Sequence, residues 1–115
     1  MIGIDVISIS RVDSSIKKFN KKFLLRYLND NEITYIKSAK NAAGFWAAKE
    51  AVSKALGTGI GKDLSFHDII LSKSEKGVPL CDLSDIIKKR YSIKNIAISI
   101  THDAGLAIAV AIIKK

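Results

Sequence analysis

The sequence predicts a single α+β domain in which an antiparallel sheet packs on one long helix, with short helices near the N-terminus. The first observation is the stretch 41–61, where apolar and small residues recur at helical spacing before a glycine-rich loop. The second is a set of short apolar segments, several of which face a neighbour across a turn. No repeat, low-complexity tract or linker divides residues 1–115, so we expect one domain.

The first segment, residues 2–10 (IGIDVISIS), alternates apolar with small or polar side chains and predicts a strand with one buried side. Asp5 lies in its middle, on the same face as Gly3 and Ile7. A carboxylate there is costly to bury and needs a cation, hydrogen-bond donors or water. The alternative is an aspartate at the strand edge that faces solvent. Short helices are expected over 10–19, over 21–28, and from Asn29 or Asp30 through Ile36.

The long helix is predicted to have an apolar core face and a more polar opposite side. The core face consists of Phe45, Ala48, Ala51, Val52, Ala55 and Leu56, and the opposite side of Trp46, Lys49, Glu50, Ser53 and Lys54. Glu50 and Lys54 stand four residues apart, so their charged groups are expected to be adjacent, and the simplest interpretation is an exposed ion pair. Gly57 is placed to end the helix in the left-handed conformation. The N–H groups of the glycines around Thr58 suit either a polyphosphate or a simple helix cap.

The second half of the chain predicts two hairpins. Residues 64–73 and 78–81 form the first around a turn at 75–77, and residues 94–101 and 106–113 form the second. Asp82 or Ser84 is expected to cap a helix between them. The last strand is apolar on both faces and must be covered twice, by the long helix and by something else, such as a neighbouring subunit. His102, at the mouth of the second hairpin, and His67 fit ordinary turn and surface positions.

The composition limits the partners and the compartment. A net charge of +8 and a pI near 9.7 favour an anionic partner, which can be nucleic acid, a membrane surface, an acidic protein or a phosphorylated small molecule. The basic residues of the early helices are Lys17, Lys18, Lys21, Lys22 and Arg26. The absence of a membrane-length apolar run and of a signal-type start predicts a cytoplasmic protein. Cys81 is the single cysteine, which excludes an internal disulfide and argues against a zinc site.

Three stretches taken together carry a family resemblance. They are GIDVISISRV near the N-terminus, FWAAKEAVSKALGTGIG followed by LSFHDI, and SITHDAGLAIAVA near the C-terminus. In order and spacing they resemble the holo-[acyl-carrier-protein] synthases, the short bacterial branch of the 4′-phosphopantetheinyl transferases. The resemblance implies that family's fold and the transfer of 4′-phosphopantetheine from coenzyme A to a serine of acyl carrier protein. Adenosine 3′,5′-bisphosphate is released, and the product serves fatty acid biosynthesis.

The resemblance also implies a site. Asp5 and Glu50 correspond to carboxylates that bind Mg²⁺, and with Lys54, which would contact the diphosphate, they form the expected catalytic set. Gly57, Thr58 and Gly59 are expected along the phosphate path, and His102 near the nucleotide end of coenzyme A. The base that takes the serine proton is either a metal-bound water or one of the carboxylates.

The family forms homotrimers with sites between subunits, and its partner is an acidic carrier protein rather than nucleic acid or a membrane. Arg11 corresponds to the arginine that docks the carrier, and the further candidates are Lys18, Lys22 and Arg26. Phe45 stands where relatives often have arginine, and Ser8 where an acidic residue is common. Two alternatives remain open: a small basic nucleic-acid-binding protein, supported by charge alone, and a family member that binds coenzyme A without catalysis.

Overall fold

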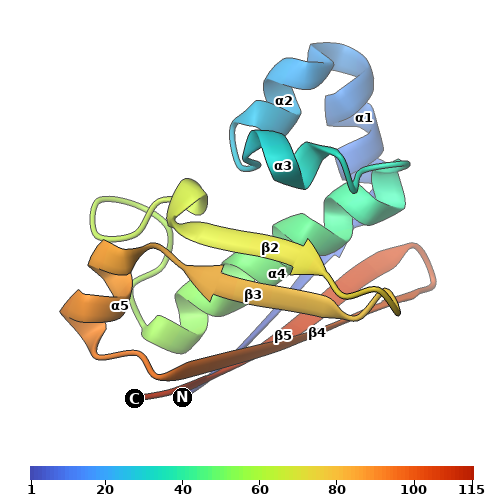
Figure 1. The fold of residues 1–115 in the computed structure, drawn as a ribbon. Coiled ribbons are helices and arrows are strands. Elements are labelled where there is room, and N and C mark those ends of the chain that lie inside the picture. The colour runs from blue at the N-terminus through green and yellow to red at the C-terminus, as the bar shows by residue number, and fades with distance from the viewer.

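The structure, a computed structural model, describes residues 1–115 and is built around one long helix (Figure 1). The elements in chain order are β1 (Ile2–Ser8), α1 (Ile9–Phe19), α2 (Lys21–Leu25), α3 (Asp30–Ile33), α4 (Ala39–Leu56), the 3₁₀ turn η1 (Phe66–Asp68), β2 (Ile69–Lys73), β3 (Pro79–Leu83), α5 (Asp85–Tyr91), β4 (Asn95–Asp103) and β5 (Leu106–Lys114). The predicted α+β class, with an antiparallel sheet on one long helix and short helices before it, is confirmed. None of the helices combines the length and the apolar character needed to cross a bilayer.

The strands form two sheets. A three-stranded antiparallel sheet has the order β1-β5-β4, so the last strand lies in the centre beside the first, and β2 pairs with β3 in a separate hairpin. The chain termini lie side by side, because the N-terminal ammonium donates a hydrogen bond to the carbonyl of Ile113 (3.0 Å). Figure 1 shows α4 running through the middle of the molecule, with α1–α3 gathered at its beginning and α5 at the opposite end.

Close packing of β1 on α4 determines the position of the predicted site. A Cβ atom added at Gly3 would collide with the backbone of Ala51 and Ala55 in α4. Only glycine allows the strand to approach the helix this closely. Asp5 follows two residues later on the same face of β1, as the alternation predicted, and therefore also points toward α4.

The helix α4 is buried on more sides than the sequence predicted. Lys49 and Ser53 were placed on its outward side, and this prediction is wrong, because both are fully buried. The sheet covers one side of α4, while α1–α3 and the η1–β2 segment cover the other. The buried Lys49 ammonium is neutralised by Glu32 of α3, because its Nζ lies 2.8 Å from Glu32 Oε1.

The predicted short elements are present with shifted ends. The second helix was expected to reach residue 28 but ends at Leu25, and the segment after it still buries Leu28. The strand expected over 64–73 begins only at Ile69, because residues 66–68 form the 3₁₀ turn. Asp68 stabilises that turn by accepting a hydrogen bond from the Ser65 N–H (3.0 Å).

The outer face of β1 and the neighbouring part of β5 is apolar and open. Ile2, Ile4 and Val6 of β1 are 69%, 62% and 55% exposed, and Ile112 beside them on β5 is 53% exposed. The inner face of β5 is covered by α4, as predicted, whereas nothing in the single chain covers the outer face. An apolar face of this kind marks a contact surface.

Candidate active site

A cleft of about 430 Å³ lies where β1, the N-terminal helices and α4 meet. Asp5 enters it from β1, Arg11 from α1, Phe23 from α2, and Trp46 and Glu50 from α4. The structure therefore brings together three residues that the sequence singled out, the two carboxylates and Arg11. It also adds an aromatic wall that the sequence did not predict as part of the site. Trp46 stands one helical turn before Glu50, and this spacing was the signal that could have identified it.

Asp5 and Glu50 are electrostatically coupled across the cleft. Burial raises the pKa of Glu50, and the negative charge of Asp5 raises it further, while Lys54 acts in the opposite direction. The Asp5 side chain is only 15% exposed, so the alternative of an aspartate at the strand edge facing solvent is wrong. Two carboxylates held this way favour a cation between them.

Lys54 is the cation nearest to Asp5. Its Nζ donates hydrogen bonds to Asp5 Oδ1 (2.9 Å) and to the carbonyl oxygen of Ile4 (3.1 Å). The ion pair expected between Lys54 and Glu50 within the helix is absent, and Lys54 instead spans from α4 to β1. The Lys54 side chain remains half exposed, so its ammonium can reach solvent or another partner.

The residues present fit a magnesium ion that takes some of its ligands from the protein and others from a phosphorylated substrate. No group of three or more histidine, cysteine, aspartate or glutamate side chains is arranged to bind a metal. Two carboxylates are nevertheless what Mg²⁺ commonly takes from a protein, because it keeps several waters and binds substrate phosphates. Asp5 and Glu50 supply hard oxygen donors and an excess of negative charge in one cleft. The same donor set does not suit a structural zinc site.

The glycine-rich loop caps the end of the helix, as the helix-cap interpretation predicted. Gly57 has φ 83° and its N–H donates to the carbonyls of Ser53 and Lys54. The N–H of Gly59 also donates to Ser53 O (3.2 Å), and Thr58 Oγ1 donates to the carbonyl of Gly59 (2.9 Å). The N–H groups of both glycines are thus already used inside the chain. No atom lies within 4 Å of a Cβ built at Gly57 or Gly59, so the loop surface is open to a ligand.

His102 lies in a different hollow from the two carboxylates. Its Nε2 donates to the carbonyl of Lys40 (3.0 Å), and it borders a hollow of about 160 Å³ together with Asn41, Phe45 and Lys73. Lys73 Nζ lies 6.0 Å from the centroid of the Phe45 ring. The structure thus does not bring His102 to Asp5 and Glu50 within one chain. No sequence pattern indicated that Lys73 would join it, because β2 meets α4 only in the folded chain.

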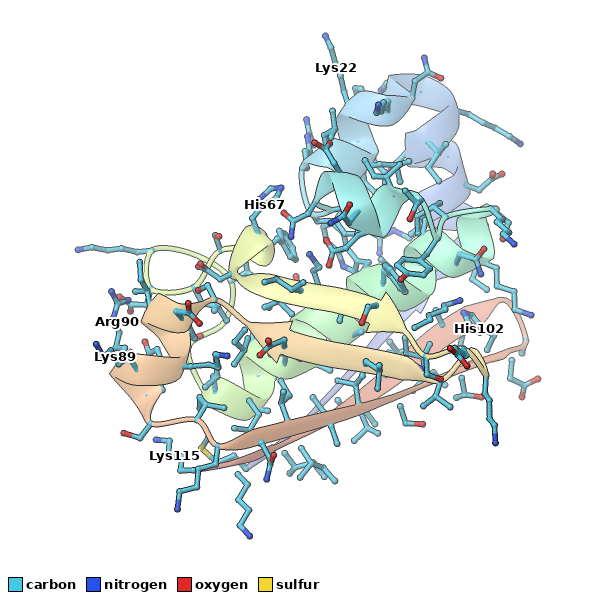
Figure 2. All side chains as sticks on the ribbon, in the orientation of Figure 1. Lys22, His67, Lys89, Arg90, His102 and Lys115 are labelled. Carbon is cyan, nitrogen blue, oxygen red and sulfur yellow. The ribbon has the colours of Figure 1, made fainter.

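The remaining basic candidates gather at the tip of the N-terminal helices. Lys18 Nζ and the Arg26 guanidinium lie 5.3 Å and 5.6 Å from the centroid of the Phe19 ring, and that ring is 41% exposed. Lys22 extends from the same tip, as Figure 2 shows. Arg11 lies apart from this group, in the cleft itself. His67 lies at the surface, as expected, and its Nε2 donates a hydrogen bond to the carbonyl of Leu25 (3.0 Å).

Known proteins resemble this chain along its length. The family model described as the 4′-phosphopantetheinyl transferase superfamily matches residues 1–111. The holo-[acyl-carrier-protein] synthase of Nautilia profundicola is 56% identical over 115 residues, which cover 100% of both proteins. That of Wolinella succinogenes is 52% identical over 115 residues, covering 100% of this chain and 98% of the relative.

Solved structures show the same likeness. The holo-[acyl-carrier-protein] synthase of Helicobacter pylori, crystallised in complex with coenzyme A, superposes with a TM-score of 0.96 at 49% identity and covers 99% of this chain and 100% of that chain. The synthase of Neisseria meningitidis superposes with a TM-score of 0.89 at 28% identity, covering 99% and 97% of the two chains.

Proposed function

Since the chain belongs to the holo-[acyl-carrier-protein] synthases of the 4′-phosphopantetheinyl transferase superfamily, we propose that it uses Mg²⁺ to transfer the 4′-phosphopantetheine of coenzyme A to a carrier protein. The serine oxygen of apo-acyl carrier protein attacks the β-phosphorus of coenzyme A. The bond from that phosphorus to the bridging oxygen breaks, and adenosine 3′,5′-bisphosphate leaves with the electron pair. The serine proton passes to a base in the cleft.

One observation carries this proposal: Asp5 and Glu50, far apart in the sequence, face one cleft with Lys54 bound to Asp5. Mg²⁺ bound there would offset the negative charge that gathers on the diphosphate and orient it. Asp5 and Glu50 would hold the ion through their carboxylate oxygens, and either a carboxylate or a water in the cleft would take the serine proton. Lys54 can leave Asp5 and place its ammonium on a phosphate oxygen.

The coenzyme A site is proposed to extend along the open glycine loop. Because the N–H groups of Gly57 and Gly59 are already bonded, we assign the direct phosphate contacts to Lys54 and to the backbone around Thr58, with the glycines permitting close approach. The hollow beside His102 is proposed for the nucleotide end. Phe45 replaces a frequent arginine there, and Lys73 is placed to supply the missing positive charge.

A homotrimer is part of the proposal. Within one chain the His102 hollow is separate from the Asp5–Glu50 cleft, so a coenzyme A molecule that uses both is best accommodated between neighbouring subunits. The exposed apolar face formed by Ile2, Ile4 and Val6 with Ile112 offers the contact surface that such an assembly needs. This would give β5 the second cover that its sequence requires.

The carrier protein is proposed to dock on the basic N-terminal helices. Arg11 would hold an acidic group of the carrier at the rim of the cleft, and Lys18, Lys22 and Arg26 would extend that contact around the exposed Phe19 ring. Opposite charges at this surface also steer the two proteins together. A cytoplasmic location belongs to the same proposal.

The function is tested by intact-mass spectrometry of apo-acyl carrier protein incubated with the enzyme, coenzyme A and Mg²⁺. We expect the carrier to gain one phosphopantetheine, and we expect Asp5→Asn, Glu50→Gln or a chelator to abolish the gain. Asp85→Asn is the matched control, because this carboxylate is fully exposed at the start of α5 and lies outside the cleft. Coenzyme A binding without transfer would instead support the non-catalytic alternative. Transfer at the normal rate by both cleft variants would contradict the metal assignment.

A further inference from the structure

A fully buried ion pair joins α4 to α3. Lys49 precedes the proposed ligand Glu50 in α4, and its side chain is 0% exposed, while that of its partner Glu32 is 1% exposed. The mechanism above uses neither residue. Buried ion pairs lose their hydration and are often no more stable than well-packed apolar residues, so a role in stability alone does not account for this pair.

Every polar group of the pair has a partner. Lys49 Nζ donates to Glu32 Oε1 (2.8 Å) and to the carbonyls of Tyr27 (2.7 Å) and Phe66 (3.0 Å). Glu32 Oε1 also accepts from the Asn29 N–H (2.7 Å), and its Oε2 accepts from the N–H of Leu71 (2.7 Å). No buried side-chain nitrogen or oxygen is left without a hydrogen bond. The network therefore joins α4 to the α2–α3 connection, to η1 and to β2.

The same connection supports the aromatic wall of the cleft. The Tyr27 ring lies 5.5 Å from that of Phe23 and 4.9 Å from that of Trp46, measured between centroids, and its hydroxyl donates to the carbonyl of Ala42 (2.9 Å). Phe23 in turn stacks on Trp46 at 6.1 Å with an interplanar angle of 12°. Phe23 and Trp46 both line the cleft. Because the hydrogen bonds of Lys49 hold the Tyr27 backbone in one place, they also set where this wall stands relative to Glu50.

We propose that Lys49 and Glu32 are positioning residues, which hold Tyr27 and, through it, Phe23 of α2 against Trp46 of α4, so that this aromatic wall meets the carrier protein beside Glu50. Directional hydrogen bonds specify one position, whereas apolar packing alone allows neighbouring elements to shift. A displacement of about 1 Å at such a site can reduce turnover about 10²-fold. The kinetic part of this inference rests on the proposed transferase function, whereas its structural part does not.

The test compares Lys49→Met and Glu32→Gln with the double variant that carries both. Each single change leaves a buried charge without its counterion and is expected to lower the melting temperature strongly. The double variant removes both charges together, so its melting temperature should recover relative to the single variants. Its KM for the carrier protein should nevertheless rise about tenfold or more, while its affinity for Mn²⁺ stays within about twofold of the wild type, because Asp5 and Glu50 are unchanged.

Trp46 provides a readout that does not depend on activity. It is the single tryptophan and stacks on Phe23, so movement of the wall should shift its emission in the folded double variant. The control removes the exposed ion pair Lys88–Asp82 (3.4 Å) by Lys88→Met with Asp82→Asn, and should change neither KM nor emission.

A double variant with wild-type KM and wild-type Trp46 emission would overturn the inference. If the wild type transfers nothing to a carrier, the proposed function fails, and the emission of Trp46 then decides the positioning role alone.

Discussion

Replacing Lys54 by methionine should separate metal binding from transfer. The substitution keeps most of the side-chain volume and removes the ammonium that lies 2.9 Å from Asp5 Oδ1. In the metal-free enzyme this ammonium competes with a divalent cation for the Asp5 carboxylate. We therefore expect Lys54→Met to bind Mn²⁺ more tightly when no coenzyme A is present and to transfer phosphopantetheine more slowly.

The size of the effect follows from the distance and the exposure. Two unit charges about 4 Å apart interact by about 1 kcal/mol in water and by about 4 kcal/mol at the effective dielectric constant of a protein surface. The Lys54 side chain is half exposed and can turn away, so we take the lower figure of about 1 kcal/mol. This corresponds to Mn²⁺ binding that is about fivefold tighter. Loss of a cation from the reacting phosphate should lower kcat about 10²-fold.

Isothermal titration calorimetry with Mn²⁺ measures the first effect, and the mass-spectrometric transfer assay measures the second. Lys54→Arg serves as the control, because it keeps the charge and should leave the Mn²⁺ affinity close to that of the wild type. Unchanged or weaker Mn²⁺ binding by Lys54→Met would refute the competition between Lys54 and the metal for Asp5.

Four further predictions concern the fold, the site and the assembly. Gly3→Ala should destabilise the protein by about 1 to 3 kcal/mol in denaturant titration, because its Cβ collides with the backbone of α4, and wild-type stability would contradict that packing. Burial and Asp5 raise the pKa of Glu50 above its ordinary value of 4.5, so the contribution of this group to stability is present at lower pH and is lost as the pH rises through the raised value. Melting curves in chelator should accordingly show a flatter pH dependence for Glu50→Gln than for the wild type. Burial raises the pKa of the Cys81 thiol to about 12, so thiol reagents should label this partly buried residue much more slowly in the native protein than after unfolding at mildly alkaline pH, and equally rapid labelling of the native protein would disagree. Ile4→Asp, on the exposed apolar face, should convert the expected trimer into smaller species by light scattering, whereas a monomeric wild type would remove the trimer from the proposal.

Residue alternation and glycine placement correctly predicted which face of β1 is buried and where the long helix ends. The alternation of residues 2–10 placed Gly3 and Asp5 on one face, and the structure has both facing α4. Gly57 ends the long helix in the left-handed conformation, as its position predicted. Each of these outcomes follows from the geometry of one element and the backbone freedom of one residue type.

The predictions that proved wrong concern contacts between segments that are distant in the sequence. Periodicity gives α4 one buried face, but it cannot reveal that a second layer covers the other face and supplies Glu32 as the partner of Lys49. The helical spacing likewise suggested Glu50 as the partner of Lys54, whereas the close approach of β1 brings Asp5 nearer. That Asp5 and Glu50 line the same cleft could be expected only from the family resemblance, because no local pattern connects a strand residue with a helix residue forty-five positions away.

Asp5 and Glu50 are proposed to share one metal ion on the diphosphate of coenzyme A. The decisive experiment is anomalous diffraction from crystals of the enzyme grown with Mn²⁺ and coenzyme A. We expect one anomalous peak within coordination distance of a carboxylate oxygen of each residue and of a diphosphate oxygen. Coenzyme A bound in the cleft with no peak between these two carboxylates, or with the metal held elsewhere, would contradict this proposal.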